Sequence, residues 1–120
     1  MAFGTGTHET TRLCLERLEA ALRPGMSMLD VGCGSGILAI AAKMLGSGET
    51  VAVDIDPLAV RVAAENAERN GVSLDLRCGD LAEQVSGTFD VVCANIVADA
   101  IIRLAPSLPA LMKPSSAFIA

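Results

Sequence analysis

Apolar and polar positions alternate between two spacings along the chain. From Glu9 the apolar residues recur every three or four positions, as in an amphipathic helix, until Arg23-Pro24-Gly25 interrupts the pattern. Residues 26–31 form a short apolar run, which is typical of a strand buried in a parallel sheet. The pattern then repeats and predicts strands at residues 26–31, 51–55, 72–78, 89–94 and 116–120, separated by helices at 37–45, 57–70 and 98–105.

Local signals at the helix ends support these boundaries. Asp56 can accept hydrogen bonds from free helix amides, and Pro57 loses nothing at a first helical position. Gly71 can end the same helix in the left-handed conformation. Prolines at 106, 109 and 114 interrupt the helical pattern after residue 105. Strands that alternate with helices of this length predict a doubly wound α/β fold with a mainly parallel sheet.

The last predicted strand runs to the final residue, Ala120. A parallel strand in that position leaves a sheet edge with nothing to cover it. The mean hydropathy of +0.50 is also high for a globular domain. Together these features predict a sheet truncated after its fifth strand and a chain that can self-associate through the exposed edge.

Composition narrows the class of protein. The 120 residues suit one domain, and a net charge of −5 with nine Lys and Arg argues against broad binding to nucleic-acid phosphates. No apolar run approaches the ~18 residues of a membrane span. The first residues lack the basic start and apolar run of a signal peptide. We therefore expect a cytoplasmic protein with no membrane partner and no direct nucleic-acid partner.

The cysteines and the single histidine give no metal signature. The four cysteines form no CxxC pair, and one histidine cannot complete a common zinc ligand set. Cys14, Cys78 and Cys93 lie in apolar stretches, where a free cysteine acts as a small hydrophobic residue. Cys33 is expected to pack beneath a glycine-rich turn, and Met44 to lie in the core.

Polar residues follow several of the predicted strands. In doubly wound folds, ligands bind beyond the carboxyl ends of the strands. The candidates at this edge are Asp30 with the glycines at 32, 34 and 36, then Asp54 with Asp56, then Asp80, and finally Asn95.

The glycine-rich segment is the first of these candidates. Glycines let the backbone approach a ligand closely, and the start of the following helix favours negative charge. The dinucleotide fingerprint requires a further glycine where this chain has Ile37, and no Gly-Lys-Ser/Thr of a P-loop is present. A tight turn without a ligand stays open as the alternative.

The acidic residues add to the ligand hypothesis. Asp54 follows Gly32 by 22 residues, a position from which a carboxylate accepts hydrogen bonds from ribose hydroxyls; a solvated loop carboxylate is the alternative. Asp56 is better explained as a helix cap. Asp80 could accept from an adenine amino group or simply form a turn.

Taken together, these motifs resemble the S-adenosylmethionine-dependent methyltransferases of the Rossmann-like class. The segments Asp30-Val-Gly-Cys-Gly-Ser-Gly, Val53-Asp54-Ile55-Asp56-Pro57 and Gly79-Asp80 carry the resemblance. The N-terminal Ala2-Phe-Gly-Thr-Gly-Thr-His-Glu-Thr-Thr, the stretch of residues 66–71 and Ala94-Asn95-Ile96 are similar, more narrowly, to the methyltransferases that modify large-subunit ribosomal protein eleven.

This resemblance implies a role for each candidate residue. Asp30 would belong to the cofactor site, and the backbone of Gly32, Gly34 and Gly36 would hold the amino-acid portion of S-adenosylmethionine. Thr11 would lie near its methionine moiety, Asp54 would bind the ribose, and Ile55 and Asp80 would contact the adenine. Asn95 would sit beside the methyl donor and the incoming amine, as the catalytic residue.

The resemblance also implies an activity and its limits. The chain would be a methyltransferase core over residues 1–120 that transfers methyl groups to a lysine or N-terminal amine of a protein, with the N-terminal substrate-recognition domain and the final strands absent. A catalytically incomplete cofactor-binding module, and an enzyme acting on lysines of another protein, stay open. A nicotinamide-dependent oxidoreductase is disfavoured by Ile37. His8 either fixes the start of the first helix or accepts a proton.

Overall fold

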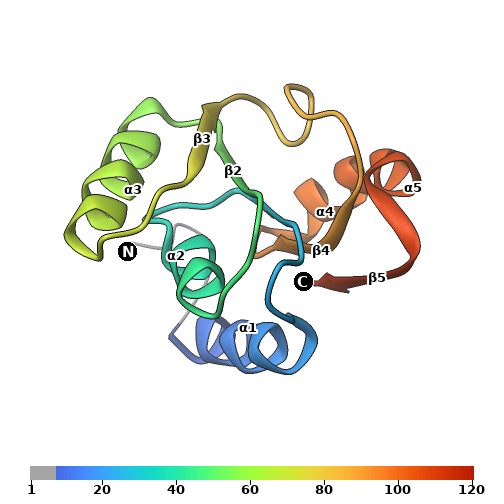
Figure 1. Ribbon diagram of the computed structural model, residues 1–120. Helices are drawn as coiled ribbons and strands as arrows, with labels where there is room; N and C mark the ends of the chain where they lie inside the picture. The colour runs from blue at the N-terminus through green and yellow to red at the C-terminus, as the bar shows by residue number, and fades with distance from the viewer. Residues whose placement is uncertain (1–7) are drawn as a thin grey trace.

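The computed structural model describes residues 8–120 and places one sheet between layers of helices (Figure 1). The elements follow in the order α1 (His8–Ala21), β1 (Met28–Val31), α2 (Ile37–Met44), β2 (Thr50–Asp54), α3 (Pro57–Arg69), β3 (Asp75–Cys78), β4 (Phe89–Ala94), α4 (Ala98–Leu104), η1 (Ala105–Ser107), α5 (Leu108–Leu111) and β5 (Met112–Ile119).

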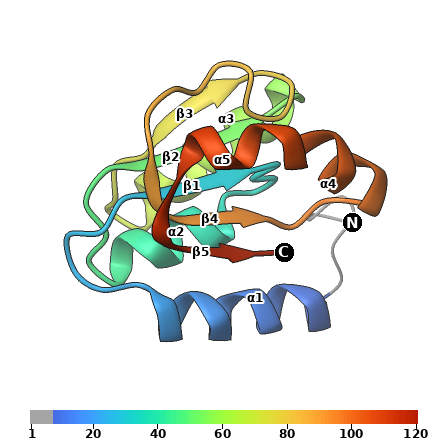
Figure 2. The same ribbon diagram turned by 90° about the vertical axis from the view of Figure 1, so that its right-hand side faces the viewer.

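The strands form a single five-stranded sheet in the order β3-β2-β1-β4-β5. All four neighbouring pairs are parallel. The first three strands run from β1 at the centre to β3 at one edge. Strand β4 then pairs with the other side of β1, and β5 forms the opposite edge. In Figure 2 the strands β1, β4 and β5 point toward the side on which α1 begins and α4 lies. The predicted doubly wound α/β fold is confirmed, and its change of direction falls between β1 and β4.

Each face of the sheet has its own apolar core. On one face, α1 and α2 pack on β1 and β4 through residues such as Leu18, Leu38 and Met28. The opposite face is covered by α4, α5 and the segment after β3, and is built around the alternate positions of the same strands, Leu29 and Val92 among them. Because successive side chains of a strand point to opposite faces of the sheet, neighbouring residues of β1 contribute to different cores.

Small residues bring α3 close to the sheet beside α2. The cluster beneath it contains Cys33, Ala39, Ala52 and Ala63, with Leu74 and Leu76 packed against it. The predicted packing of Cys33 beneath the glycine turn is confirmed, since its side chain is buried. Small side chains allow helices and strands to approach closely, so this corner of the molecule tolerates little added volume.

Two boundaries differ from the sequence prediction because of proline. The prolines at 106 and 109 do not end the helical region; each is the second residue of its element, η1 or α5, in the first turn, where no backbone N–H is needed. Strand β5 begins at Met112, ahead of Pro114, because Met112 already pairs with Phe89 of β4. The register then shifts between Phe89 and Val91, and this irregularity in the ladder accommodates the proline.

Other predictions at this level have mixed outcomes. Asp56 caps α3, accepting from the Leu58 amide at 2.9 Å, and Gly71 follows the helix with a φ of 68°. The predictions for Cys78 and Met44 were wrong, because both side chains are exposed, Met44 by 66%. Within residues 8–120, β5 pairs only with β4, and self-association through that edge stays a prediction.

Candidate functional site

The carboxyl edge of the sheet gathers most of the predicted site residues. The glycine-rich loop follows β1, Asp54 ends β2, Asp80 follows β3 by two residues, and Asn95 follows β4 directly. Because β1 and β4 are paired neighbours, the glycine loop and Asn95 leave the sheet side by side at its change of direction. Ligands bind doubly wound sheets at this position.

Two glycines of the loop have positive φ and little or no room for a side chain. Gly32 has a φ of 73°, and a Cβ added there would overlap the Cγ2 methyl of Ile96. Gly36 has a φ of 87°, and an added Cβ would lie 3.0 Å from the Cβ of Ala63. The loop is thus wedged between the residue that follows Asn95 and helix α3. Only glycine meets both the conformational and the spatial requirement.

Asp54 links the glycine loop to the end of β2. Its Oδ2 accepts a hydrogen bond from the Gly34 amide at 2.9 Å, and its Oδ1 accepts from the Asp56 amide at 2.9 Å. A carboxylate has about four lone-pair directions, so each oxygen keeps acceptor capacity for a ligand hydroxyl. Asp54 therefore shapes the loop and still has capacity to bind a diol.

Asp30 lies beneath the loop rather than on its surface. The side chain is 1% exposed, and neither oxygen has a hydrogen-bond partner among the described residues. Burial raises the pKa of this carboxyl to about 7, with the Ala39 backbone amide opposing the rise and Asp54 adding to it. The Ala39 contact does not satisfy hydrogen-bond geometry, so it leaves both oxygens able to accept. A buried acceptor without a partner is costly and calls for a functional explanation.

Thr11 is the second buried residue with an unpartnered polar atom. Its side chain is 4% exposed, and its Oγ1 has no hydrogen-bond partner within the described part of the chain. It lies near the start of α1. The start of this helix is on the side of the molecule toward which the strands point (Figure 2). The sequence prediction placed Thr11 in the same site as Asp30.

The β2 and β3 side of the edge is more open. Ile55 is 65% exposed directly after β2. Asp80 lies 3.6 Å from the guanidinium of Arg103 on α4, and Leu81 next to it has a positive φ of 52°. Positive φ in a bulky residue is uncommon and is found at turns and functional sites. Sequence reasoning missed both Arg103 and Leu81, because no local pattern marks a contact between β3 and α4.

One predicted segment lies outside the described residues. Residues 1–7, which include most of the Gly-Thr-Gly-Thr-His stretch, carry no structural description. His8 is the first residue of α1, but its side chain is likewise outside the described part. Both proposed roles of His8 therefore stay predictions.

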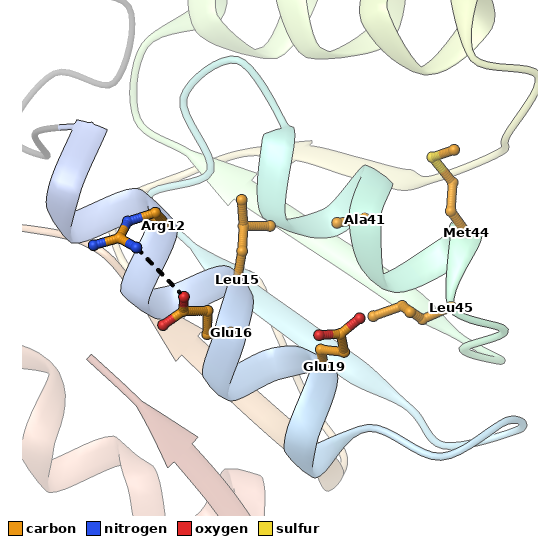
Figure 3. A pocket seen from close by; sticks show the side chains of 7 residues that line it. All are labelled: Arg12, Leu15, Glu16, Glu19, Ala41, Met44 and Leu45. Carbon is orange, nitrogen blue, oxygen red and sulfur yellow. Dashed lines mark ion pairs between the residues drawn. The ribbon is translucent and has the colours of Figure 1, made fainter.

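Away from the strand ends, two shallow grooves adjoin along α2, with Leu15, Ala41 and Met44 lining both. One of about 330 Å³ lies between α1 and α2, with Leu15 facing Ala41 across it and an Arg12–Glu16 ion pair of 3.7 Å on its rim (Figure 3). The other, of about 320 Å³, extends from Met44 to Ser35 and Asn66. Only the second groove reaches the glycine loop.

The described residues contain no group of three or more potential metal ligands from His, Cys, Asp and Glu. Among the same residues, no helix combines the length and the apolar character that a membrane span requires. The described residues at the strand-end site offer backbone amides, carboxylates and an asparagine.

Comparison with known proteins assigns the family. A family model described as ribosomal protein L11 methyltransferase (PrmA) matches residues 1–120. The chain belongs to this family. It is 51% identical over 120 residues to the ribosomal protein L11 methyltransferase of Symbiobacterium thermophilum, covering 100% of this chain and 40% of that protein. For the Pelotomaculum thermopropionicum protein of the same name the identity is 56% over 122 residues, with 100% and 40% covered.

Solved structures agree with this assignment. A ribosomal protein L11 methylase from Lactobacillus delbrueckii subsp. bulgaricus superimposes with a TM-score of 0.90 at 38% identity, over 94% of this chain and 60% of that one. A Thermus thermophilus 16S rRNA methyltransferase at 23% identity has a TM-score of 0.84, which supports the fold alone. The resemblance inferred from the sequence motifs is confirmed. The chain spans about two fifths of the length of the curated relatives it matches.

Proposed function

We propose that the carboxyl edge of the sheet binds S-adenosylmethionine and that the chain is the cofactor-binding core of a protein methyltransferase. The observation that carries this proposal is the glycine loop, whose three glycines have positive φ and which is hydrogen-bonded to the Asp54 carboxylate. Membership of the L11 methyltransferase family supports the choice of cofactor.

The residues present fit the parts of that cofactor. The glycine backbone at positions 32 and 36 would hold its amino-acid portion, and the unpartnered oxygens of Asp30 supply a buried acceptor for an ammonium group. The spare acceptor capacity of Asp54 suits the two ribose hydroxyls. On the open side, Ile55 offers an exposed apolar surface and Asp80 a carboxylate, which suit the adenine ring and its amino group.

Thr11 and Asn95 complete the proposed site. The unpartnered Thr11 hydroxyl would face the methionine moiety. When bound, the cofactor supplies an activated methyl group. Asn95 would accept a hydrogen bond from the incoming amine and direct its lone pair toward that methyl. Positioning of this kind can supply a large part of a rate enhancement, because effective molarities of ~10⁵ M or more are reached by well-oriented groups.

The proposed acceptor is an amino group of a protein, a lysine side chain or an N-terminal amine, and the proposed protein is ribosomal protein L11. The names of the relatives support this substrate. Residues 1–120 are proposed to form only the methyltransferase core. The domain that recognises the substrate is proposed to correspond to parts of the longer relatives that do not align with these residues. Action on lysines of another protein is the alternative. The cytoplasmic location stays a prediction.

A transfer assay with the longer protein tests the catalytic part of the proposal. Asn95→Ala is expected to lower the transfer of labelled methyl groups to ribosomal protein L11 by ~10-fold or more, a loss on the scale of one positioning hydrogen bond, and to change S-adenosylhomocysteine affinity far less. The same assay with residues 1–120 alone distinguishes an active core from a binding module. Equal losses of transfer and affinity in the variant would contradict a role in orienting the amine.

A further inference from the structure

Helix α3 contacts the glycine loop from behind at two points. The Cα and Cβ of Ala63 lie against Gly36, so that a Cβ added to Gly36 would be only 3.0 Å from the Cβ of Ala63. One turn further along the helix, the side-chain Nδ2 of Asn66 donates a hydrogen bond of 2.9 Å to the backbone carbonyl of Ser35. Both contacts join residues about 30 positions apart in the chain, and neither Ala63 nor Asn66 belongs to the set of residues proposed above to touch the cofactor.

The orientation of the Asn66 side chain is fixed by a second bond. The guanidinium Nη1 of Arg69 donates to Asn66 Oδ1 at 3.0 Å. Because Oδ1 accepts from Arg69, Nδ2 is the atom directed at the Ser35 carbonyl, and the amide has one arrangement that satisfies both partners. The helix that carries both residues is itself capped by Asp56.

The bond from Asn66 completes the restraint of one peptide unit. The Ser35 carbonyl and the Gly36 amide belong to the same planar unit, so fixing one fixes the other. The Gly36 amide donates to the Cys33 carbonyl at 2.9 Å, while Asn66 holds the Ser35 carbonyl on the other side. This unit immediately precedes α2, whose first residue is Ile37. Its rotation would shift the glycine backbone of the loop, which is proposed above to hold the amino-acid portion of the cofactor.

We propose that Asn66 is a positioning residue that acts through Ser35 far more strongly on the amino-acid half of the cofactor site than on the adenosine half. The inference rests on the proposed cofactor function. Three residues at the ends of β2 and β3 are proposed to hold the ribose and the adenine, namely Asp54, Ile55 and Asp80. None of them makes a described contact with Asn66. A merely structural role would weaken both halves together.

Two probes separate the halves. S-adenosylhomocysteine carries both adenosine and the amino-acid portion, whereas 5′-methylthioadenosine lacks the amino and carboxylate groups. Calorimetric titration of the 120-residue chain with each probe is expected to show that Asn66→Ala lowers S-adenosylhomocysteine affinity ~5–30-fold, the range for loss of a positioning hydrogen bond, and 5′-methylthioadenosine affinity less than about twofold.

Matched variants serve as controls. Asn70→Ala removes a side chain from the same helix end, where its Nδ2 donates only to the Asn66 carbonyl at 2.8 Å, and is expected to change neither affinity. Asn66→Gln keeps an amide donor and should recover part of the S-adenosylhomocysteine affinity. Asn66→Asp matches the size of Asn66 but places an acceptor against the Ser35 carbonyl, so it should behave like Asn66→Ala or worse while preserving side-chain volume.

Three results would overturn the inference. Equal losses for the two probes would assign Asn66 a general structural role, and an unchanged S-adenosylhomocysteine affinity in both Asn66→Ala and Asn66→Asp would assign it none. If Asn66→Ala does not fold, the comparison of Asn66→Gln with Asn66→Asp decides, since equal affinities for these two would also contradict it. Failure of the unmodified, folded chain to bind either probe would instead contradict the proposed function itself.

Discussion

The carboxylates at the two ends of the sheet differ in how their oxygens are hydrogen-bonded. At the amino end, Asp90 accepts from both the amide and the hydroxyl of Ser27, at 2.9 and 3.2 Å, and from Lys113 Nζ at 2.9 Å. At the carboxyl end, Asp30 is buried with no hydrogen-bond partner among the described residues. One carboxylate is fully engaged and the other is left with unused acceptors.

The pKa values of these two carboxyls differ accordingly. Hydrogen bonding from the Ser27 backbone amide, followed by Lys113, lowers the pKa of Asp90. Burial raises the pKa of Asp30 to about 7. Lys43, another charged side chain near the amino end, also has a partner, because its Nζ donates to the Gly48 carbonyl at 2.7 Å. Among the described residues, the buried side-chain atoms without a hydrogen-bond partner, those of Thr11 and Asp30, lie toward the carboxyl end, which supports the proposal that this end binds a ligand.

The largest effect is expected from Gly32→Ala at the carboxyl end. Positive φ costs a residue with a Cβ about 1–2 kcal/mol, and overlap with Ile96 adds about 1–3 more, so the free energy of unfolding should fall by up to ~5 kcal/mol with loss of S-adenosylhomocysteine binding. Urea denaturation and calorimetry measure both. Gly71→Ala is the control, because Gly71 has a φ of 68° with nothing within 4 Å of an added Cβ. Equal losses in the two variants would refute the contact with Ile96.

Asp30→Asn should change how stability depends on pH. The folded pKa of Asp30 is about 7, above the ordinary 3.8, so between those values the folded state retains a proton that the unfolded chain has released. The free energy of unfolding should therefore fall as pH rises from about 4 to 7, by on the order of 4 kcal/mol. Asn carries no such proton and should lack this decline. Parallel stability curves for the two proteins at pH 5 and pH 8, without cofactor, would contradict the assignment.

Asp54→Ala is expected to weaken S-adenosylhomocysteine binding by ~1–3 kcal/mol, through loss of its ribose hydrogen bonds and of its bond to the Gly34 amide. Isothermal calorimetry gives the affinity. Asp56→Ala, which removes the helix cap beside it, should lower stability by about 1 kcal/mol with little change in affinity. An unchanged affinity in the Asp54 variant would remove the ribose assignment.

The smallest effect on binding should come from the amino end. Asp90→Ala removes the acceptor for Ser27 and Lys113 and should cost about 1–2 kcal/mol of stability while leaving cofactor affinity unchanged. Because the pKa of Asp90 is lowered, its contribution is present above its unfolded pKa and should disappear as pH falls through the folded value. A marked drop in affinity for this variant would erase the distinction between the two ends.

The fold and the outline of the site were open to prediction from the sequence because both depend on local patterns. Apolar runs and helix signals such as Asp56-Pro57 identify the elements, and strand-helix alternation restricts the topology. The glycine motif and Asp54 follow strands directly, so their meeting at one edge is a consequence of parallel pairing.

Contacts between distant segments were not predictable in the same way. The bond from Asn66 to Ser35 and the ion pair of Arg103 with Asp80 depend on how helices settle on the sheet. Likewise, the exposure of Met44 depends on which side of α2 meets α1, and a helix that is apolar at every position but Lys43 does not specify that side. Tertiary packing decides these features.

Calorimetric titration of the folded chain with S-adenosylhomocysteine, with a nicotinamide dinucleotide as control, tests whether the carboxyl end is a methyltransferase cofactor site. The expected result is saturable binding of S-adenosylhomocysteine with no heat from the dinucleotide. A demonstrably folded chain that binds only the dinucleotide, or neither compound, would contradict the assignment of this site.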